Sequence, residues 1–401
     1  MVSIQLVIYW ILSAQMTSPR FIRGLQAYLD HWLGKTADLN DAIIRQLNPD
    51  FAGLLKVVEL GLVLPETQEK TADLILQCFF WVEQVGYVPV WQPLVALAVG
   101  RVPAEKVRLR FRLLKQLGQL QRLQYQLETA AATLQQAEQL AHSLADEQAV
   151  AEIYINLCQV YHLQGKYEDA EEYGRLALDC LADNQHKFKA IALRTMGTMA
   201  QEQGFLQKAN GYLQASLKLS VSPKERALTL NVLAVIYQQQ EQYDQALETY
   251  DELPTLLDST TNTPLFVEIL LNKGSLLYSL GRLNEAEVEF KEADRLLQQR
   301  PGLFFYKALA ANNLGCIWRE REQFGAAEAS FRRSIQQFAQ VGSDIYQANA
   351  WGNLAKLCTR RDRRSEAMAC YDEALRLVAS YPDNAFAQKL QTDYSSLRYE
   401  L

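Results

Sequence analysis

The sequence predicts an all-α protein, a solenoid of about seven helical hairpins with an additional helical N-terminal region. Three observations support this fold class. An alanine recurs about every 40 residues from Ala130 to Ala367, and a small residue stands twelve positions before each one. Apolar residues around these columns keep helical spacing. A chain of 401 residues also exceeds the ~250–300 residues at which a single core stops growing, which favours an elongated array.

The recurring positions form three columns through the repeat units. The alanines are Ala130, Ala170, Ala209, Ala246, Ala286, Ala327 and Ala367. The residues twelve positions earlier are Gly118, Cys158, Gly197, Ala234, Gly274, Gly315 and Ala355. The residues seven positions later are Ala137, Ala177, Ser216, Leu253, Ala293, Ser334 and Ala374. Two helices approach closely only where the crossing point carries little side chain, so the columns predict the contact points of helical hairpins.

Short polar turns separate the two helices of each unit, as in QGKYED, EQGFLQ, LGRLNE and REQFGA, and predict a left-handed residue at the end of the first helix. Segments such as NKGSLLYSLGRLNEAEVEFKEA (272–293) and NNLGCIWREREQFGAAEASFRRS (312–334) resemble the tetratricopeptide-repeat (TPR) consensus. The resemblance covers about residues 109–378 and implies a right-handed α-solenoid. The period near 40 is similar to the longer repeats of kinesin light chains, the Pins family, and MalT-type and Rap-type regulators.

The unit that begins near Leu228 departs most from the pattern. Glu241 stands in place of the turn glycine, and Pro254 falls within the second helix. Proline removes a backbone donor, so we expect a kink or a slight break in the superhelix there.

The regions outside the columns define the domain organisation. Residues 1–15 form an apolar extension that is too short to span a bilayer and lacks the positive n-region of a signal peptide. Either Met16 is the true start, or the extension is a cryptic signal or interfacial anchor. Residues 16–100 are a separate helical domain or degenerate repeats that cap the array. Residues 101–380 are the seven-repeat array, and residues 381–401 are a C-terminal capping helix.

Composition argues against several classes of function. The net charge of −6 does not favour a whole-surface nucleic-acid binder. Six cysteines without a C-x-x-C pair fit a reducing cytoplasm, and four scattered histidines give zinc little to bind. No nucleotide-binding, metalloprotease or hydrolase motif occurs. The sequence therefore predicts a cytoplasmic protein that is no enzyme and has no cofactor, no metal site and no membrane partner.

A ladder of amides is the main candidate site. By resemblance to peptide-binding TPRs, the residue two before each small position faces the concave groove. These residues are Gln116, Asn156, Thr195, Val232, Asn272, Asn313 and Asn353. An amide both donates and accepts, so such a ladder can hold the main chain of an extended ligand. The alternative is that asparagine merely solvates the helix surface, although its poor helix propensity makes the recurrence hard to explain that way.

Neighbouring positions add charge to the predicted groove. Arg194, Arg319, Lys356 and Arg360 lie at one-turn offsets, and Asn231 and Asn312 stand one residue before the ladder. Basic residues concentrate towards the C-terminal end, where TRRDRR (359–364) holds four arginines. We therefore expect a ligand with acidic side chains or a free carboxylate.

Three functions are consistent with these patterns. The first is a scaffold or adaptor that binds an extended peptide in the groove. The second is a sensory or regulatory module, similar to the Rap or MalT type, that acts through its N-terminal region. The third, which we consider less favoured, is a nucleic-acid binder that uses the basic helix at 101–122. That helix is otherwise a solvated face. Partner identity and oligomeric state cannot be predicted from the sequence.

Overall fold

The structure is a computed structural model that describes residues 18–39, 41–181, 186–257, 263–298, 300, 302–382 and 384–401. Within these ranges every regular element is a helix, which confirms the predicted all-α fold. The predictions about residues 1–15 and the true start of the chain lie outside the described residues.

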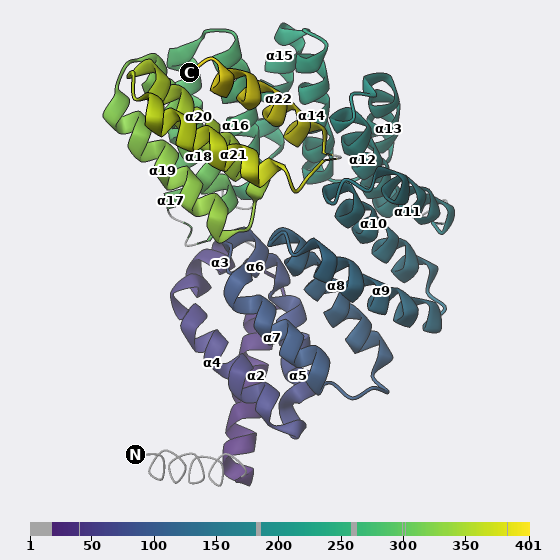
Figure 1. Cartoon of the computed structure of the whole chain (residues 1–401). Helices are drawn as coiled ribbons and strands as arrows, with labels where there is room; N and C mark the ends of the chain where they lie inside the picture. Colours follow the sequence, from purple (N-terminus) through teal and green to yellow (C-terminus); the bar gives the residue numbers. More distant parts are fainter. Residues whose placement is uncertain are drawn as a thin grey trace, which may run out of the picture.

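Seven helical hairpins form the array, as predicted (Figure 1). The first helices are α8 (Val107–Leu123), α10 (Glu147–Leu163), α12 (His186–Glu202), α14 (Pro223–Gln239), α16 (Thr263–Ser279), α18 (Phe304–Glu320) and α20 (Asp344–Arg360). The second helices are α9 (Leu127–Ser143), α11 (Tyr167–Asp179), α13 (Leu206–Leu219), α15 (Tyr243–Leu256), α17 (Leu283–Gln298), α19 (Phe324–Gln340) and α21 (Arg364–Val378). Pro254 lies in the last turn of α15 and does not divide that helix.

The small columns lie where the two helices of each hairpin cross. A Cβ atom on Gly274 or Gly315 would fall 2.5–2.6 Å from the ring of Phe290 or Phe331 on the second helix. Real Cβ atoms do not approach closer than 3.0 Å, so the ring fills the space that the glycine leaves. All seven alanines of the repeat column are 0% exposed. The predicted contact points are therefore confirmed.

The turn inside each hairpin ends the first helix in the same way. The residue seven positions after the small column has a positive φ in every unit, from 54° to 81°. These residues are Tyr125, Gly165, Gly204, Glu241, Gly281, Glu322 and Asp362. The left-handed conformation lets the following amides bond the last carbonyls of the first helix. The predicted helix ends are therefore confirmed, including the four that have no glycine.

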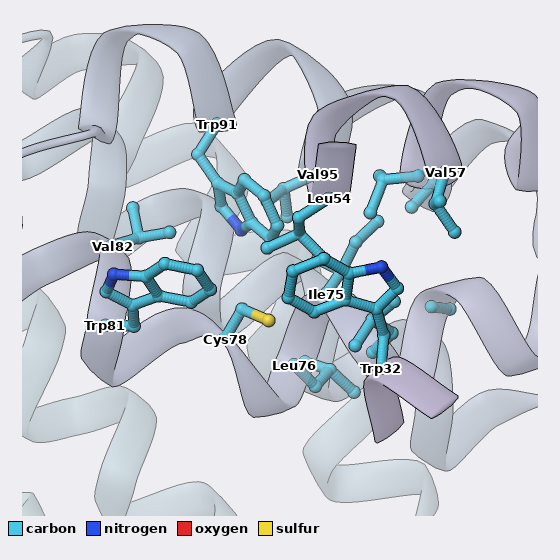
Figure 2. Close-up of a cluster of buried hydrophobic side chains, with 14 of the residues drawn as sticks. Trp32, Leu54, Val57, Ile75, Leu76, Cys78, Trp81, Val82, Trp91 and Val95 are labelled. Carbon is cyan, nitrogen blue, oxygen red and sulfur yellow. The ribbon is translucent and has the colours of Figure 1, made fainter. Parts of the chain in front are cut away.

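Residues 19–101 fold into a compact group of helices with its own core. The elements are α2 (Pro19–Thr36), α3 (Asp41–Leu47), α4 (Phe51–Val63), α5 (Gln68–Gln77), α6 (Phe79–Val85) and α7 (Val88–Arg101), with short 3₁₀ turns at Asn48–Asp50 and Pro65–Thr67. Figure 2 shows Trp32, Trp81 and Trp91 converging around Cys78 in this core. Leu113, Leu117 and Leu120 of α8 belong to the same core, so the array grows directly from this region.

The array curves back until its C-terminal half meets the N-terminal helices (Figure 1). The amide of Gly302, just before α18, donates to the carbonyl of Val85 at the end of α6, with N···O 3.4 Å. The ring of Phe305 stacks on Tyr125 in the α8–α9 turn, with centroids 6.0 Å apart. Lys224 at the start of α14 lies 5.3 Å from the ring centre of Phe80 on α6. These contacts close the superhelix between residues that are more than 140 positions apart in the sequence.

The far end of the array carries α22 (Ala385–Tyr399), which packs on α20 and α21. The hydroxyl of Tyr394 donates to Oδ1 of Asn349 on α20 over 3.2 Å. None of the described helices is both long enough and apolar enough to cross a membrane.

Candidate peptide-binding surface

The first helices of the hairpins form the inner surface of the superhelix. Each first helix packs against the first helix of the next hairpin, from α8 through α20. The second helices do not pack on one another to the same extent within the described residues. On a curved stack, elements are closest on the concave side, so the first helices line the inside. The predicted site residues all stand on these first helices.

Two pairs of predicted asparagines bond each other between successive hairpins. Nδ2 of Asn272 donates to Oδ1 of Asn231 over 3.3 Å, and Nδ2 of Asn353 donates to Oδ1 of Asn312 over 3.1 Å. In each pair, the donor stands two residues before the small position of its own hairpin. The acceptor stands three residues before the small position of the preceding hairpin. Asn313 instead donates to Oγ of Ser275 over 3.4 Å. The amides thus form bridges between neighbouring repeats.

A second set of bridges lies about two turns further along the same helices. In this set, one partner stands four residues after the small position of its hairpin. The other partner stands five residues after the small position of the next hairpin. His162 bonds Glu202 over 2.7 Å, Gln201 donates to Gln239 over 3.0 Å, and Tyr278 donates to Glu320 over 3.2 Å. These bridges join α10 to α12, α12 to α14, and α16 to α18. We call the two sets of bridges the inner ladders.

The C-terminal basic residues of the prediction already have partners. Arg319 is buried and donates to Tyr278 Oη over 3.3 Å, to Glu320 over 3.2 Å and to Asn353 over 3.5 Å. Arg360 binds Glu320 over 2.9 Å and the carbonyl of Arg319 over 3.3 Å. Paired arginines keep the pKa of Glu320 below its usual range, against the opposing effect of burial, which is the largest single influence. Both arginines at this end of the inner surface therefore have hydrogen-bond and ion-pair partners within the protein.

The remaining basic groups at this end are engaged as well. Lys356 lies 5.7 Å from the ring centre of Tyr394, and burial, followed by the charge of Arg319, lowers the pKa of its ammonium group. In the run at 359–364, Arg361 and Arg363 bind Glu328, at 3.4 and 2.8 Å. Arg363 also binds Glu366. The arginine-rich segment is therefore a set of local ion pairs that joins the α20–α21 turn to α19 and to the start of α21.

The predicted residues at the N-terminal end have structural partners too. Nδ2 of Asn156 donates to the carbonyl of Glu152 in its own helix over 2.6 Å. Gln116 donates to the carbonyl of Leu76 on α5 over 3.0 Å, so this ladder position holds the N-terminal helices to the array. Along the basic helix, Lys106 and Lys115 bind Glu69 and Glu152, which engages part of its positive charge.

Arg194 differs from the other basic residues of the prediction. It lines a cavity of about 210 Å³ between α8, α10 and α12, together with Thr195, Arg122 and Glu202. No described acidic side chain lies within 4.0 Å of either arginine. Burial lowers the pKa of the Arg194 guanidinium, while the charges of Glu268 and Glu225 act in the opposite direction. Thr195 accepts from Gln159 over 3.3 Å at the cavity wall.

The sequence columns chosen for the prediction do not include Arg122, His162 or Glu202, which all line this cavity. A signal for them is present in the sequence. They occupy the fourth and fifth positions after the small column, which form the second inner ladder. Nothing in one repeat shows that these positions meet, because the contact joins residues about 40 apart on different hairpins.

Comparison with known families agrees with this architecture. A model described as "MalT-like TPR region" matches residues 151–300, and one described as "Tetratricopeptide repeat" matches residues 350–385. The chain is also similar to the photosystem I assembly protein Ycf3 of Parasynechococcus marenigrum, at 30% identity over 124 residues. That match covers 31% of this chain and 68% of the relative.

Solved structures show the same fold at low sequence identity. The apo form of the quorum sensor NprR from B. thuringiensis has a TM-score of 0.55 and 16% identity, covering 88% of this chain and 99% of that one. The Cut9 and Hcn1 hetero-tetramer structure of the APC/C gives a TM-score of 0.54 and 14% identity, covering 90% of this chain and 68% of that one. At these identities the likeness establishes the fold alone.

Proposed function

We propose that this chain, which belongs to the tetratricopeptide-repeat family, is a non-catalytic scaffold that binds an extended peptide segment on its inner surface. The proposal rests on the asparagine side chains of the first inner ladder and its neighbouring positions. Asn272 and Asn313 are half-buried, and each uses an amide N–H in a bond to a neighbouring residue. No described residue donates to their Oδ1 atoms, so each can accept from a ligand N–H.

The bridges between repeats prepare these acceptors for binding. Asn231 is held by Glu268 over 2.8 Å, and it in turn fixes Asn272. An amide whose orientation is already fixed loses little conformational entropy when a ligand arrives. In the proposal Asn272 and Asn313 contact the peptide, whereas Asn231, Asn312 and Asn353 hold the wall behind them. Each bond contributes ~0.5–1.5 kcal/mol net, so a stable complex needs several along the array.

The test is a selection of displayed 12-residue peptides against the full chain. We expect enriched peptides to bind the parent and to lose affinity for the double variant Asn272→Ala with Asn313→Ala, by about tenfold or more. The melting temperature should change little, since both residues are partly exposed. Affinity is measured by isothermal titration, and folding by circular dichroism.

The matched control is Asn210→Ala with Gln214→Ala, because these amides are exposed on the second helix α13. This variant should bind the selected peptides as the parent does. Failure to enrich any peptide, or equal binding to all three proteins, would contradict a peptide-binding inner surface.

A regulatory function is the second candidate, and the closure of the superhelix favours it. The turn before α18 meets α6 through Gly302 and Val85, so a ligand that changes the pitch of the array would move the N-terminal helices. Small-angle X-ray scattering with and without a selected peptide distinguishes the two functions. A change in radius of gyration supports regulation, and an unchanged one supports a rigid scaffold.

A further inference from the structure

Arg122 and Arg194 project into the same cavity from α8 and α12 without an ion pair. The structure places no described carboxylate within 4.0 Å of either guanidinium group. Nε of Arg122 is buried and has no hydrogen-bond partner within the described part of the chain. Glu202 also lines the cavity, but its carboxylate is already engaged by His162 at 2.7 Å.

The inner ladders explain why both arginines lack partners. Arg122 stands four residues after the small position of its hairpin, as His162 and Tyr278 do in theirs. His162 and Tyr278 each bond the residue that stands five positions after the small position of the next hairpin. The residue that faces Arg122 in this register is Leu163, which has no acceptor. Arg194 stands three residues before its small position, as Asn231 and Asn312 do. Its counterpart in that register is Val232. At both places an apolar residue replaces the partner.

An unpaired guanidinium in a partly closed site is unfavourable for folding. Removing a charge from water costs several kcal/mol unless a partner of opposite charge replaces the lost solvent. Burial is the largest influence on both groups and lowers the pKa of each guanidinium, although Glu83 and Glu268 act against it from a distance. Neither of the two guanidinium groups in the cavity is paired with a described carboxylate. A bound anion would supply the missing partner.

We propose that this cavity is a carboxylate-binding subsite of the peptide surface, in which Arg122 and Arg194 receive an acidic side chain or the C-terminal carboxylate of the ligand. This inference rests on the proposed function. The volume of about 210 Å³ accommodates a carboxylate with its short aliphatic stem. A guanidinium binds a carboxylate through two parallel hydrogen bonds, which gives both affinity and a fixed orientation. The predicted acidic preference of the ligand is thereby located between α8 and α12.

The test uses small probes and needs no selected peptide. N-acetyl-glutamate amide carries a side-chain carboxylate, N-acetyl-alanine carries a terminal carboxylate, and N-acetyl-glutamine amide carries neither. Their binding to the full chain is measured by titration monitored with NMR. We expect the carboxylates to bind and the neutral amide to bind at least about tenfold more weakly. The stronger of the two carboxylates identifies the source of the anion.

Two variants address the arginines directly. Arg122→Met should weaken carboxylate binding by about tenfold or more. Leu163→Glu should do the same without removing an arginine, because it supplies the missing ladder partner to Arg122; circular dichroism checks that this variant is folded, since Leu163 packs against the core of the first hairpins. The matched control Arg332→Met removes an exposed, paired arginine from α19 and should bind the probes normally.

Equal binding of glutamate and glutamine probes would overturn the inference, as would unchanged affinity in both cavity variants. Inorganic phosphate that binds more tightly than either carboxylate and competes with them would reassign the cavity to phosphate and overturn the inference as well. If carboxylates bind here while no displayed peptide is enriched, the subsite stands and the proposed peptide function fails.

Discussion

The two ends of the inner surface use arginine in different ways. Between α18 and α20, Arg319 and Arg360 share Glu320, and Arg319 also donates to Tyr278 and Asn353. Between α8 and α12, Arg122 and Arg194 face a cavity and have no ion pair with any described residue. Both ends are built from the same repeat in the same register. They differ in the acceptors that surround the arginines, because Glu320 and Tyr278 lie beside Arg319, whereas Leu163 and Val232 stand at the ladder positions of Arg122 and Arg194.

This comparison teaches that local density of positive charge is a poor guide to a binding site. The run TRRDRR holds four arginines, yet Arg360, Arg361 and Arg363 are engaged by Glu320 and Glu328. Arg122 and Arg194, whose ladder positions face Leu163 and Val232, line a cavity and have no ion pair with a described residue. A charge is available to a ligand when the fold has left it without a partner.

The largest effect should come from breaking the closure that encloses the N-terminal end. A Cβ atom on Gly302 would overlap the carbonyl group of Gly86, whose own φ is 84°. Gly302→Ala must therefore separate α6 from α18 or cost about 1–3 kcal/mol through overpacking. We expect a larger radius of gyration in small-angle X-ray scattering and greater solvent access to Arg122.

Gly211→Ala is the matched control, because nothing lies within 4 Å of the added Cβ on the exposed side of α13. Its radius of gyration should equal that of the parent. An unchanged radius and stability in Gly302→Ala would show that the two ends are not closed in solution.

Removing one arginine from each end should affect stability differently. Arg319→Met leaves Asn353 and Tyr278 without a donor and should lower the free energy of unfolding by about 1–3 kcal/mol. Arg122→Met removes a charge that has no partner and should leave stability equal or higher. Urea denaturation measures both. Equal destabilisation by the two variants would mean that Arg122 is paired in solution.

A smaller, pH-dependent effect should come from Glu268, whose charge acts on Arg194. Burial raises the pKa of the Glu268 carboxyl, although Tyr306, Asn231 and Arg194 act to lower it. Because folding raises this pKa, the stability it contributes is present at acid pH and is lost as pH rises through the raised value.

Glu268→Gln stays neutral at every pH, so it should be more stable than the parent near neutrality and similar to it in acid. Thermal melts across the acid-to-neutral range measure this difference. A constant difference at all pH values would contradict the raised pKa.

Much of the fold could be predicted because its determinants repeat. Gly274 and Gly315 mark helix crossings, and Phe290 and Phe331 fill the space beside them. The asparagine positions also fell on the inner helices, but whether they contact a peptide stays a prediction. The pairing of Asn231 with Asn272 was not predicted, since it depends on the stagger between neighbouring hairpins.

The sequence by itself determined the hairpins, their crossing points and their left-handed turns, because each follows from contacts within about 40 residues that recur in every unit. The tertiary structure alone decided which charges are paired and where the superhelix closes. Arg319 has partners on three hairpins. The amide of Gly302 donates to the carbonyl of Val85, which stands more than 200 residues earlier in the sequence. Such contacts depend on the accumulated curvature of the stack, which no single repeat contains.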